Sequence, residues 1–367
     1  MENRKYLIFL LVFVFLFIPL FSFAYKPDTT HKGLTRDVIK LYEYYYSNRF
    51  TDSEKISIEK GAVDEDNGTR ALNHFYDPVY NKGIVLTSKD WSQNTIAQKD
   101  WGGKGLATAG TYVGALFDSN TDYSWDRAIY EYLYGDKNRG LESLGHILHL
   151  IEDVTTPDHT RNDLHPDFVY QNTVDQESPY ENFTNKFDIS NINISKNLIN
   201  EGLKPVIYLT LGEYFDRMAI YSNNNFFSKD TIFEKKYNQP QISFEKVQKL
   251  SDGNKYLFGF NKISNSSEYK LVRIRRSFSF QNGTTTDYYI TDNDYSILTD
   301  YWNLLSRQAV LNGAGVIKLF FDEVEKEKQT HALYEKNKSW LARTKDSVLN
   351  IFSSSLDISK NQNLASV

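Results

Sequence analysis

Residues 140–159 read GLESLGHILHLIEDVTTPDH, and this stretch determines the rest of the interpretation. An apolar stripe recurs in it at helical spacing, at Leu141, Leu144, Leu148 and Ile151. The helix is expected to end near Pro157, because proline cannot continue it. At about 100° per residue, His146, His149 and Asp153 fall within an arc of about 60°, roughly opposite the stripe. One helical face therefore presents two imidazoles and a carboxylate.

Such a face is either a solvated polar surface or a metal site. Solvated faces are usually built from Lys, Glu and Arg, whereas His149 and Asp153, four residues apart, can bind one metal from the same side. His159, just beyond the helix end, is placed to reach a neighbouring metal. Only His331 lies far from the other histidines, which are His31, His74, His146, His149, His159 and His165. The first half of the chain thus holds the candidate metal ligands.

Composition narrows the classes of protein to consider. The 367 residues contain no Cys, which excludes disulfides, thiolate zinc fingers and a cysteine nucleophile. With 42 Lys and Arg against 47 Asp and Glu, the net charge is −5. This charge argues against a broad basic surface for nucleic acid, although it leaves room for a nuclease whose metals meet the phosphate.

The N-terminus has the pattern of a secretory signal. Arg4 and Lys5 precede an almost wholly apolar run over residues 6–21, and Ala24 closes a small-residue cleavage pattern. Cleavage after Ala24 predicts a secreted or periplasmic protein whose mature chain begins at Tyr25. The alternative is an uncleaved N-terminal membrane anchor.

Hydrophobic periodicity predicts a mainly α fold with a small antiparallel β insertion. Helical spacing dominates from about residue 35 to residue 221 and returns from about 295 to 328. Between them, short β-branched and aromatic runs are separated by turn residues. The expected organisation is a helical domain over 25–238, a β-rich insertion over 239–292, C-terminal helices over 293–345 that complete the helical domain, and a polar tail over 346–367.

Four motifs occur in the order found in one family. Residues 144–159 (LGHxxHxxxDxxxPxH) resemble the central motif of the zinc-dependent phospholipase C and single-strand-specific nuclease superfamily, with HxxxDxxxxxH as its specific part. The other matches are THKGLT at 30–35, Glu65-Asp66 followed by NHFYDP at 73–78, and YENF at 180–183. The resemblance covers residues 25–183 and is nearest to a bacterial phospholipase C-like branch.

The resemblance implies a multi-helix fold that binds three zinc ions. The ligands of one ion would be His74, His149 and Asp153. Asp66 would face the same pair of metals, and Asp153 would bridge to a second ion. That second ion would also be held by His31 and by the free α-amino group and carbonyl of Tyr25, so cleavage of the signal would create a ligand.

The third ion is where the chain departs from the family pattern. His159 and Glu181 match two of its ligands, but the position four residues before Glu181, where the family has a histidine, is Glu177. Either His165 or Glu177 would complete the site. We favour His165, because imidazole suits zinc and the stretch from Arg161 to His165 resembles the bacterial branch.

The implied activity is hydrolysis of a phosphodiester by a metal-activated water, without a covalent intermediate. Asp66, chosen over Asp64 on the Glu65-Asp66 match, would orient and deprotonate that water. The expected substrate is a phospholipid headgroup ester. Aromatic residues such as Phe226 and Phe227 would either make transient contact with a membrane surface or lie in the core. The alternatives are a single-strand-specific nuclease of the same fold and a non-catalytic secreted zinc-binding or structural protein.

Two further residues have two interpretations each. His146 is either a group that orients a metal ligand or a packing histidine. Arg161 either contacts a substrate phosphate or forms a structural pair with Asp163 or Asp158.

Overall fold

The computed structural model of the protein describes residues 27–100, 117, 119–163, 178–263, 268–280 and 283–338. The helical elements in these ranges are η1 (Pro27–His31), α2 (Lys32–Tyr45), α3 (Asp52–Asp64), η2 (Gly68–Asn73), α4 (Ser88–Gln93), α5 (Thr95–Asp100), α6 (Trp125–Tyr134), α7 (Lys137–Asp153), α8 (Pro157–Thr160), α9 (Pro179–Thr184), η4 (Ile189–Asn191), α10 (Ile194–Asn200), α11 (Leu211–Asn225), η5 (Lys229–Thr231), α12 (Ser296–Thr330) and α13 (Ala332–Asn337). The predicted signal segment and polar tail lie outside the described residues.

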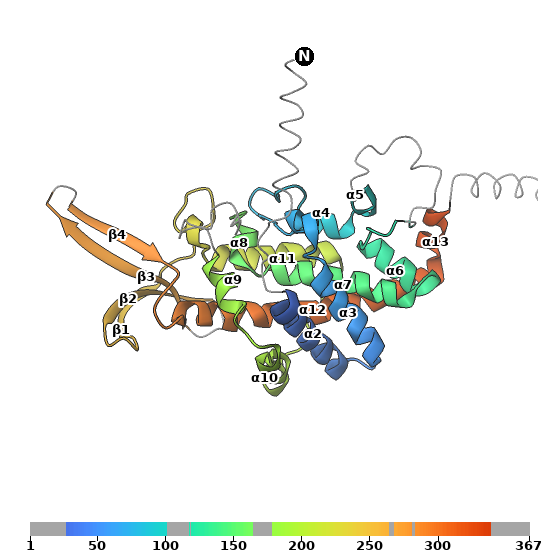
Figure 1. The fold of residues 1–367 in the computed structure, drawn as a ribbon, viewed down its shortest axis with the longest axis horizontal. Coiled ribbons are helices and arrows are strands. Elements are labelled where there is room, and N and C mark those ends of the chain that lie inside the picture. Colours follow the sequence, from blue (N-terminus) through green and yellow to red (C-terminus); the bar gives the residue numbers. More distant parts are fainter. Residues whose placement is uncertain are drawn as a thin grey trace, which may run out of the picture.

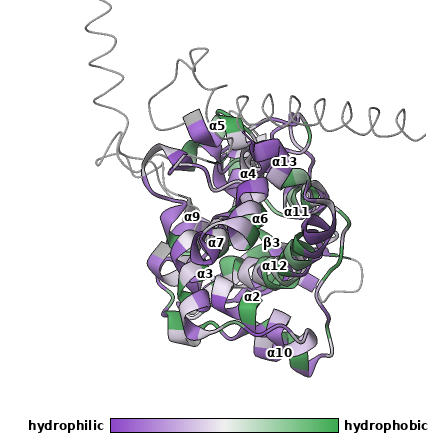
Figure 2. Cartoon of the chain, turned by 90° about the vertical axis from the view of Figure 1, so that its right-hand side faces the viewer, coloured by the Kyte–Doolittle hydropathy of each residue, from purple (hydrophilic) through white to green (hydrophobic). Residues whose placement is uncertain are grey.

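The helices pack around the long helix α12. Its apolar residues, including Leu305, Val316 and Phe320, are fully buried. In Figure 2 the green, hydrophobic residues of α12 lie among α2, α6 and α7. None of the helices in the described ranges combines the length and apolar character needed to cross a bilayer.

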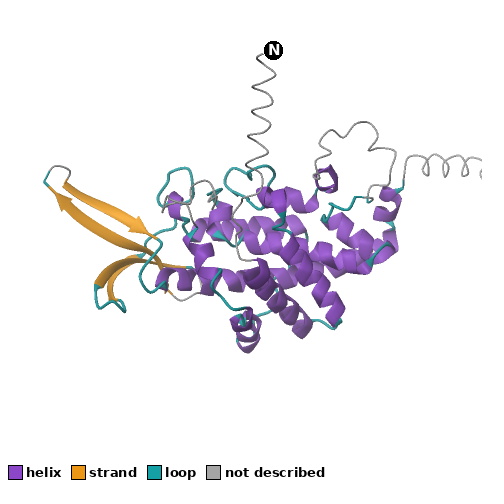
Figure 3. Ribbon diagram, in the orientation of Figure 1, coloured by secondary structure: helices purple, strands orange, loops and turns teal. Residues whose placement is uncertain are grey.

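The prediction of a mainly α fold with a small β insertion is wrong. About 56% of the described residues are helical, and a four-stranded antiparallel sheet in the order β1-β2-β3-β4 makes the fold mixed α and β (Figure 3). The strands are β1 (Phe244–Lys249), β2 (Lys255–Lys262), β3 (Glu268–Ser279) and β4 (Gly283–Tyr289).

The sheet shares the core of the helices. Phe258, Leu271 and Val272 are fully buried in the same hydrophobic cluster as α12. The hydroxyl of Tyr301 on α12 donates to the backbone oxygen of Leu271 on β3 at 2.9 Å. The strands that sequence periodicity located therefore form an integral layer, because their apolar face has no other surface to cover it.

Two glycines allow α3 and α7 to cross closely. A Cβ on Gly61 would lie 1.9 Å from the backbone oxygen of Glu142, and one on Gly145 would lie 2.0 Å from that of Ile58. Real Cβ atoms do not approach oxygen so closely, so any side chain at either position must push the helices apart. This crossing matters for function, because α7 carries His149 and Asp153, and Asp66 directly follows α3.

We expect Gly145→Ala to lower the free energy of unfolding by about 1–3 kcal/mol, because the added methyl group overpacks the crossing. Gly212→Ala is the matched control, since Gly212 is also helical and its Cβ would meet no atom closer than 3.8 Å. That variant should be neutral or gain up to about 1 kcal/mol from helix propensity. Urea denaturation measures both, and equal stabilities for the two variants would contradict the proposed crossing.

Candidate metal centre

The predicted ligands come together at one buried place. His31 lies where η1 meets α2, Asp66 follows α3, and His74 ends η2. His149 and Asp153 lie one turn apart on α7. All five residues are at most 1% exposed. Two groups among them bring potential ligand atoms within 4.8 Å of one another: His31, His149 and Asp153, and Asp66, His74 and His149.

The distances in the second group match those of a tetrahedral site. Oδ1 of Asp66 lies 3.5 Å from Nδ1 of His74 and 3.4 Å from Nε2 of His149, and the two nitrogens are 3.3 Å apart. Zinc bonds of about 2.0–2.1 Å in tetrahedral geometry separate neighbouring ligand atoms by about 3.3 Å. Oδ2 of Asp153 is 2.8 Å from Nδ1 of His74 and 3.1 Å from Nε2 of His149, so this carboxylate contacts both imidazoles of the group.

Asp153 links this group to two further pairs. Its other oxygen, Oδ1, is 3.4 Å from Nε2 of His31. On the opposite side, Nδ1 of His159 on α8 is 3.8 Å from Oδ2 of Asp153. Nε2 of His159 lies 3.4 Å from Oε1 of Glu181 on α9. One carboxylate therefore stands between three sets of potential ligands.

The buried charges fit a cation. Both oxygens of Asp66 are buried, and neither accepts a hydrogen bond of good geometry from the residues that the structure describes. Burial opposes charge on the imidazoles, yet the carboxylates around them raise the pKa of His74 to about 9 and that of His149 well above its ordinary value. The imidazoles in turn hold the pKa of Asp153 well below its usual range, against the effect of burial. A divalent cation would stabilise this set and release protons from the imidazoles.

Each imidazole is oriented through its second ring nitrogen. Nδ1 of His149 donates to the backbone oxygen of Ala62 on α3 at 2.7 Å, and Nδ1 of His159 donates to that of His74 at 3.3 Å. Nε2 of His74 faces Oε1 of Glu65 at 3.7 Å. Such partners select the tautomer in which the other nitrogen faces the metal position.

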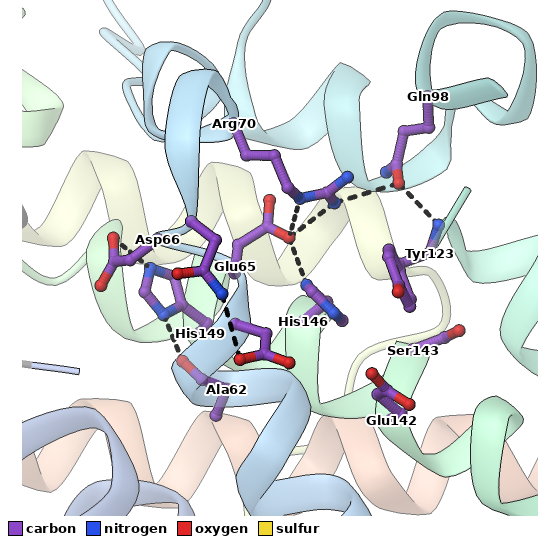
Figure 4. Close-up of polar contacts among 12 residues, drawn as sticks. Ala62, Glu65, Asp66, Arg70, Gln98, Tyr123, Glu142, Ser143, His146 and His149 are labelled. Carbon is purple, nitrogen blue, oxygen red and sulfur yellow. Dashed lines mark hydrogen bonds and ion pairs between the residues drawn. The ribbon is translucent and has the colours of Figure 1, made fainter. Parts of the chain in front are cut away.

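Glu65 is the centre of a second polar cluster (Figure 4). Its Oε2 accepts two hydrogen bonds from Arg70, at 2.8 and 2.6 Å, and one from Nδ1 of His146 at 2.5 Å. Its Oε1 accepts from Nε1 of Trp91 at 2.8 Å. Despite burial, these donors hold the pKa of Glu65 well below its usual range. His146 therefore contacts Glu65 and packs against the ring of Tyr123, and among the described residues it joins neither group of potential metal ligands.

Glu152 orients the imidazole of His31. Oε2 of Glu152 is 2.7 Å from Nδ1 of His31, and Oε1 accepts from the hydroxyl of Thr35 at 2.9 Å. The side chain is fully buried, which raises the pKa of Glu152, and the contacts with His31 and Thr35 offset this only in part. A buried carboxylate costs free energy unless it is paired, so the ring of His31 is firmly held.

Of the residues predicted from sequence, the structure brings together His31, Asp66, His74, His149, Asp153, His159 and Glu181. Tyr25, His165 and Glu177 lie outside the described residues. Asp64 points to the surface, where it pairs with Lys60. That arrangement supports the choice of Asp66 over Asp64.

Arg161 has a structural role. Its guanidinium is fully buried and donates to the backbone oxygens of Asn223 and Asn238, at 2.5 and 2.7 Å. It lies between the rings of Phe227 and Tyr237. These contacts tie α8 to the segment after α11, in a place that a phosphate does not reach without rearrangement.

The sequence interpretation missed the roles of Glu65 and Glu152. For Glu65, nothing local distinguishes a buried carboxylate from a surface one. For Glu152, a signal was present, because it lies four residues after Leu148 on the apolar stripe of α7. A carboxylate on that stripe must be buried and paired.

The described chain thus contains buried His and Asp groups that could hold a metal ion. In comparisons with protein-family models, with curated proteins and with solved structures, the chain matches none.

We expect Asp153→Asn to lose most of the metal bound by the purified protein, because this carboxylate adjoins the ligand nitrogens of His31, His74 and His149. Elemental mass spectrometry after gel filtration measures metal per chain. His331→Gln is the matched control, since His331 contacts Tyr134 at the far end of α12. Wild-type metal content in Asp153→Asn would contradict the assignment.

Glu152→Gln should weaken metal binding by about 10- to 100-fold, because the amide keeps the size of the side chain but no longer holds His31 with a full charge. Competition with a chromophoric chelator gives the affinity. Glu142→Gln, on the same helix, removes only a surface pair with Lys60 and should bind metal as the wild type does. Equal affinities for the two variants would show that Glu152 does not orient a ligand.

Proposed function

We propose that the protein is a secreted zinc-dependent phosphodiesterase that hydrolyses phospholipid headgroup esters. The observation that carries the proposal is the buried cluster around Asp153, in which Oδ1 of Asp66 and the nitrogens of His74 and His149 lie at the separations of neighbouring ligands in a tetrahedral zinc site. The order of motifs along the chain adds support from the family resemblance.

Zinc fits the donor set best among common metals. Imidazole nitrogen together with carboxylate oxygen suits zinc, whereas magnesium and calcium prefer oxygen alone.

Three ions are expected. Asp66, His74, His149 and Asp153 would hold one, Asp153 and His31 a second, and His159 with Glu181 a third. Tyr25 for the second ion, and His165 or Glu177 for the third, stay predictions from the sequence.

When bound, zinc ions lower the pKa of water and offset the negative charge that develops on a phosphate. The protein supplies the rest. Asp66 is the candidate to orient the attacking water and accept its proton at a carboxylate oxygen. Glu152 holds the imidazole of His31 in place and the carboxylate of Glu65 faces that of His74, so that the geometry is set before the substrate arrives.

We propose a lipid rather than a nucleic acid as the substrate. The acidic balance of the chain disfavours a polyanion with many phosphates outside the centre. Phe226 and Phe227, the candidates for membrane contact, are fully buried in the core. A lipid surface must therefore contact another part of the protein. The alternatives are a single-strand-specific nuclease and a zinc protein without turnover.

Asp66→Asn should lower kcat on phosphatidylcholine, expressed per bound metal ion, by at least about 100-fold, because the variant lacks the proton acceptor. Asp64→Asn, a surface change two residues earlier, should leave the rate unchanged. Release of phosphocholine is the measurement. Equal rates in the two variants would remove Asp66 from the mechanism.

The same preparation distinguishes the alternatives. Chelation should abolish hydrolysis and added zinc should restore it. Faster cleavage of single-stranded DNA than of phosphatidylcholine would assign the nuclease activity. No turnover of either substrate by the fully metallated protein would favour the non-catalytic interpretation.

A further inference from the structure

The outer half of β3 and β4 extends beyond the rest of the sheet. The ladder between β2 and β3 ends at the pair Leu257–Ile274, whereas the ladder between β3 and β4 continues to Ser279–Gly283. Five residues at about 3.3 Å each make this two-stranded ribbon about 17 Å long. Figures 1 and 3 show it projecting from the helices at one end of the molecule.

Two phenylalanines lie near the end of this ribbon. Phe278 is 70% exposed and Phe280 is 99% exposed, and their rings contact each other edge to face at 5.4 Å between centroids. Side chains alternate along a strand, so both rings lie on the face of β3 that also carries Ile274. Ile274 is buried, and beyond it Arg276 and the two rings occupy the same face in solvent. Exposing two adjacent aromatic rings costs free energy unless a partner covers them.

Cationic side chains stand directly behind the rings. Arg275 and Arg276 are exposed on the same ribbon, and Arg276 precedes Phe278 by two residues, which is about 7 Å along the strand. The described part of β3 and β4 contains four Lys and Arg (Lys270, Arg273, Arg275 and Arg276) and two Asp and Glu (Glu268 and Asp287), in a chain whose net charge is −5. Arg276 pairs with Glu245 on β1 and Arg275 lies opposite Asp287 on β4, but exposed pairs of this kind contribute little free energy, so a lipid phosphate can compete with these carboxylates for the guanidinium groups.

This arrangement has the dimensions of a membrane contact. Peripheral segments enter the boundary between headgroups and acyl chains by about 5–10 Å. With the phenylalanines at that depth, the guanidinium groups lie at the level of the lipid phosphates, where they bind anions well.

A second copy of the chain is a less suitable partner for this surface than a membrane. Two Phe side chains bury roughly 300–500 Å² together, whereas a stable interface buries about 800 Å² on each partner.

We propose that the end of the β3–β4 ribbon, through Phe278, Phe280, Arg275 and Arg276, inserts into the surface of anionic bilayers. This inference deepens the proposed function, on which its biological meaning rests, because it supplies the lipid contact that a phospholipase needs. The contact itself does not depend on bound metal or on turnover.

Vesicle co-sedimentation tests the proposal, with full-length protein and vesicles of phosphatidylcholine alone or mixed with phosphatidylserine. The wild type should bind, and more tightly when phosphatidylserine is present. The double variant Phe278→Ser/Phe280→Ser should bind at least about tenfold more weakly. Both positions are exposed, so the variant should fold normally. Leu209→Ser is the matched control, because Leu209 is 82% exposed elsewhere on the protein, and it should bind as the wild type does.

Hydrolysis of a soluble monomeric phosphodiester distinguishes failure of the membrane contact from failure of the proposed function. The double variant should hydrolyse it at the wild-type rate, while losing activity on vesicles. Hydrolysis of the soluble substrate by a wild type that binds no vesicles would overturn the membrane contact alone. Vesicle binding without hydrolysis of any substrate would overturn the function alone. Equal vesicle binding by wild type and double variant, or loss of self-association in the variant, would also overturn the membrane contact.

Discussion

The fully buried carboxylate of Asp153 is the constraint on which the rest of the structure depends. A charge in the interior costs several kcal/mol unless it is paired, and Asp153 is paired with imidazoles from three other parts of the chain. His31, His74 and His159 must therefore be brought to α7 by the fold. The close crossing of α3 and α7 at Gly61 and Gly145 is one means of doing so, because it also brings Asp66 into the same group.

The contacts behind the ligands join the centre to the fold. The backbone oxygen of Ala62 on α3 accepts from His149 on α7, and Glu152 on α7 contacts both His31 and Thr35 on α2. Each orienting bond therefore also connects two helices. A shift of any one helix would disturb the position of an imidazole, so the geometry of the centre and the packing of the helices depend on each other. A metal ion would consequently stabilise the folded protein as a whole.

The sequence revealed those parts of the centre that depend on local spacing. His149 and Asp153 share a face because they are four residues apart on one helix, and His159 follows the turn at Pro157. Glu65 and His146 meet across 81 positions, and His31 and Glu152 across 121, and no pattern within a window of ten residues encodes such pairings. The same limit explains the burial of Phe226, whose ring packs against Tyr301 and Tyr269, and of Phe227, whose ring faces Arg161, because these partners lie in distant segments.

The fold class was predicted wrongly for a related reason. Alternation and turn residues located the four strands, but they describe each strand separately and do not tell what its apolar face will cover. Leu271 and Val272 cover α12, so the inner half of the sheet belongs to the common core. Beyond Ile274 the same face has no helix opposite it among the described elements, and Phe278 and Phe280 are left in solvent. One strand thus has two environments along one face: a buried inner half that packs in the common core, and an exposed outer half where Arg276 separates Ile274 from the two rings and where we propose the membrane contact.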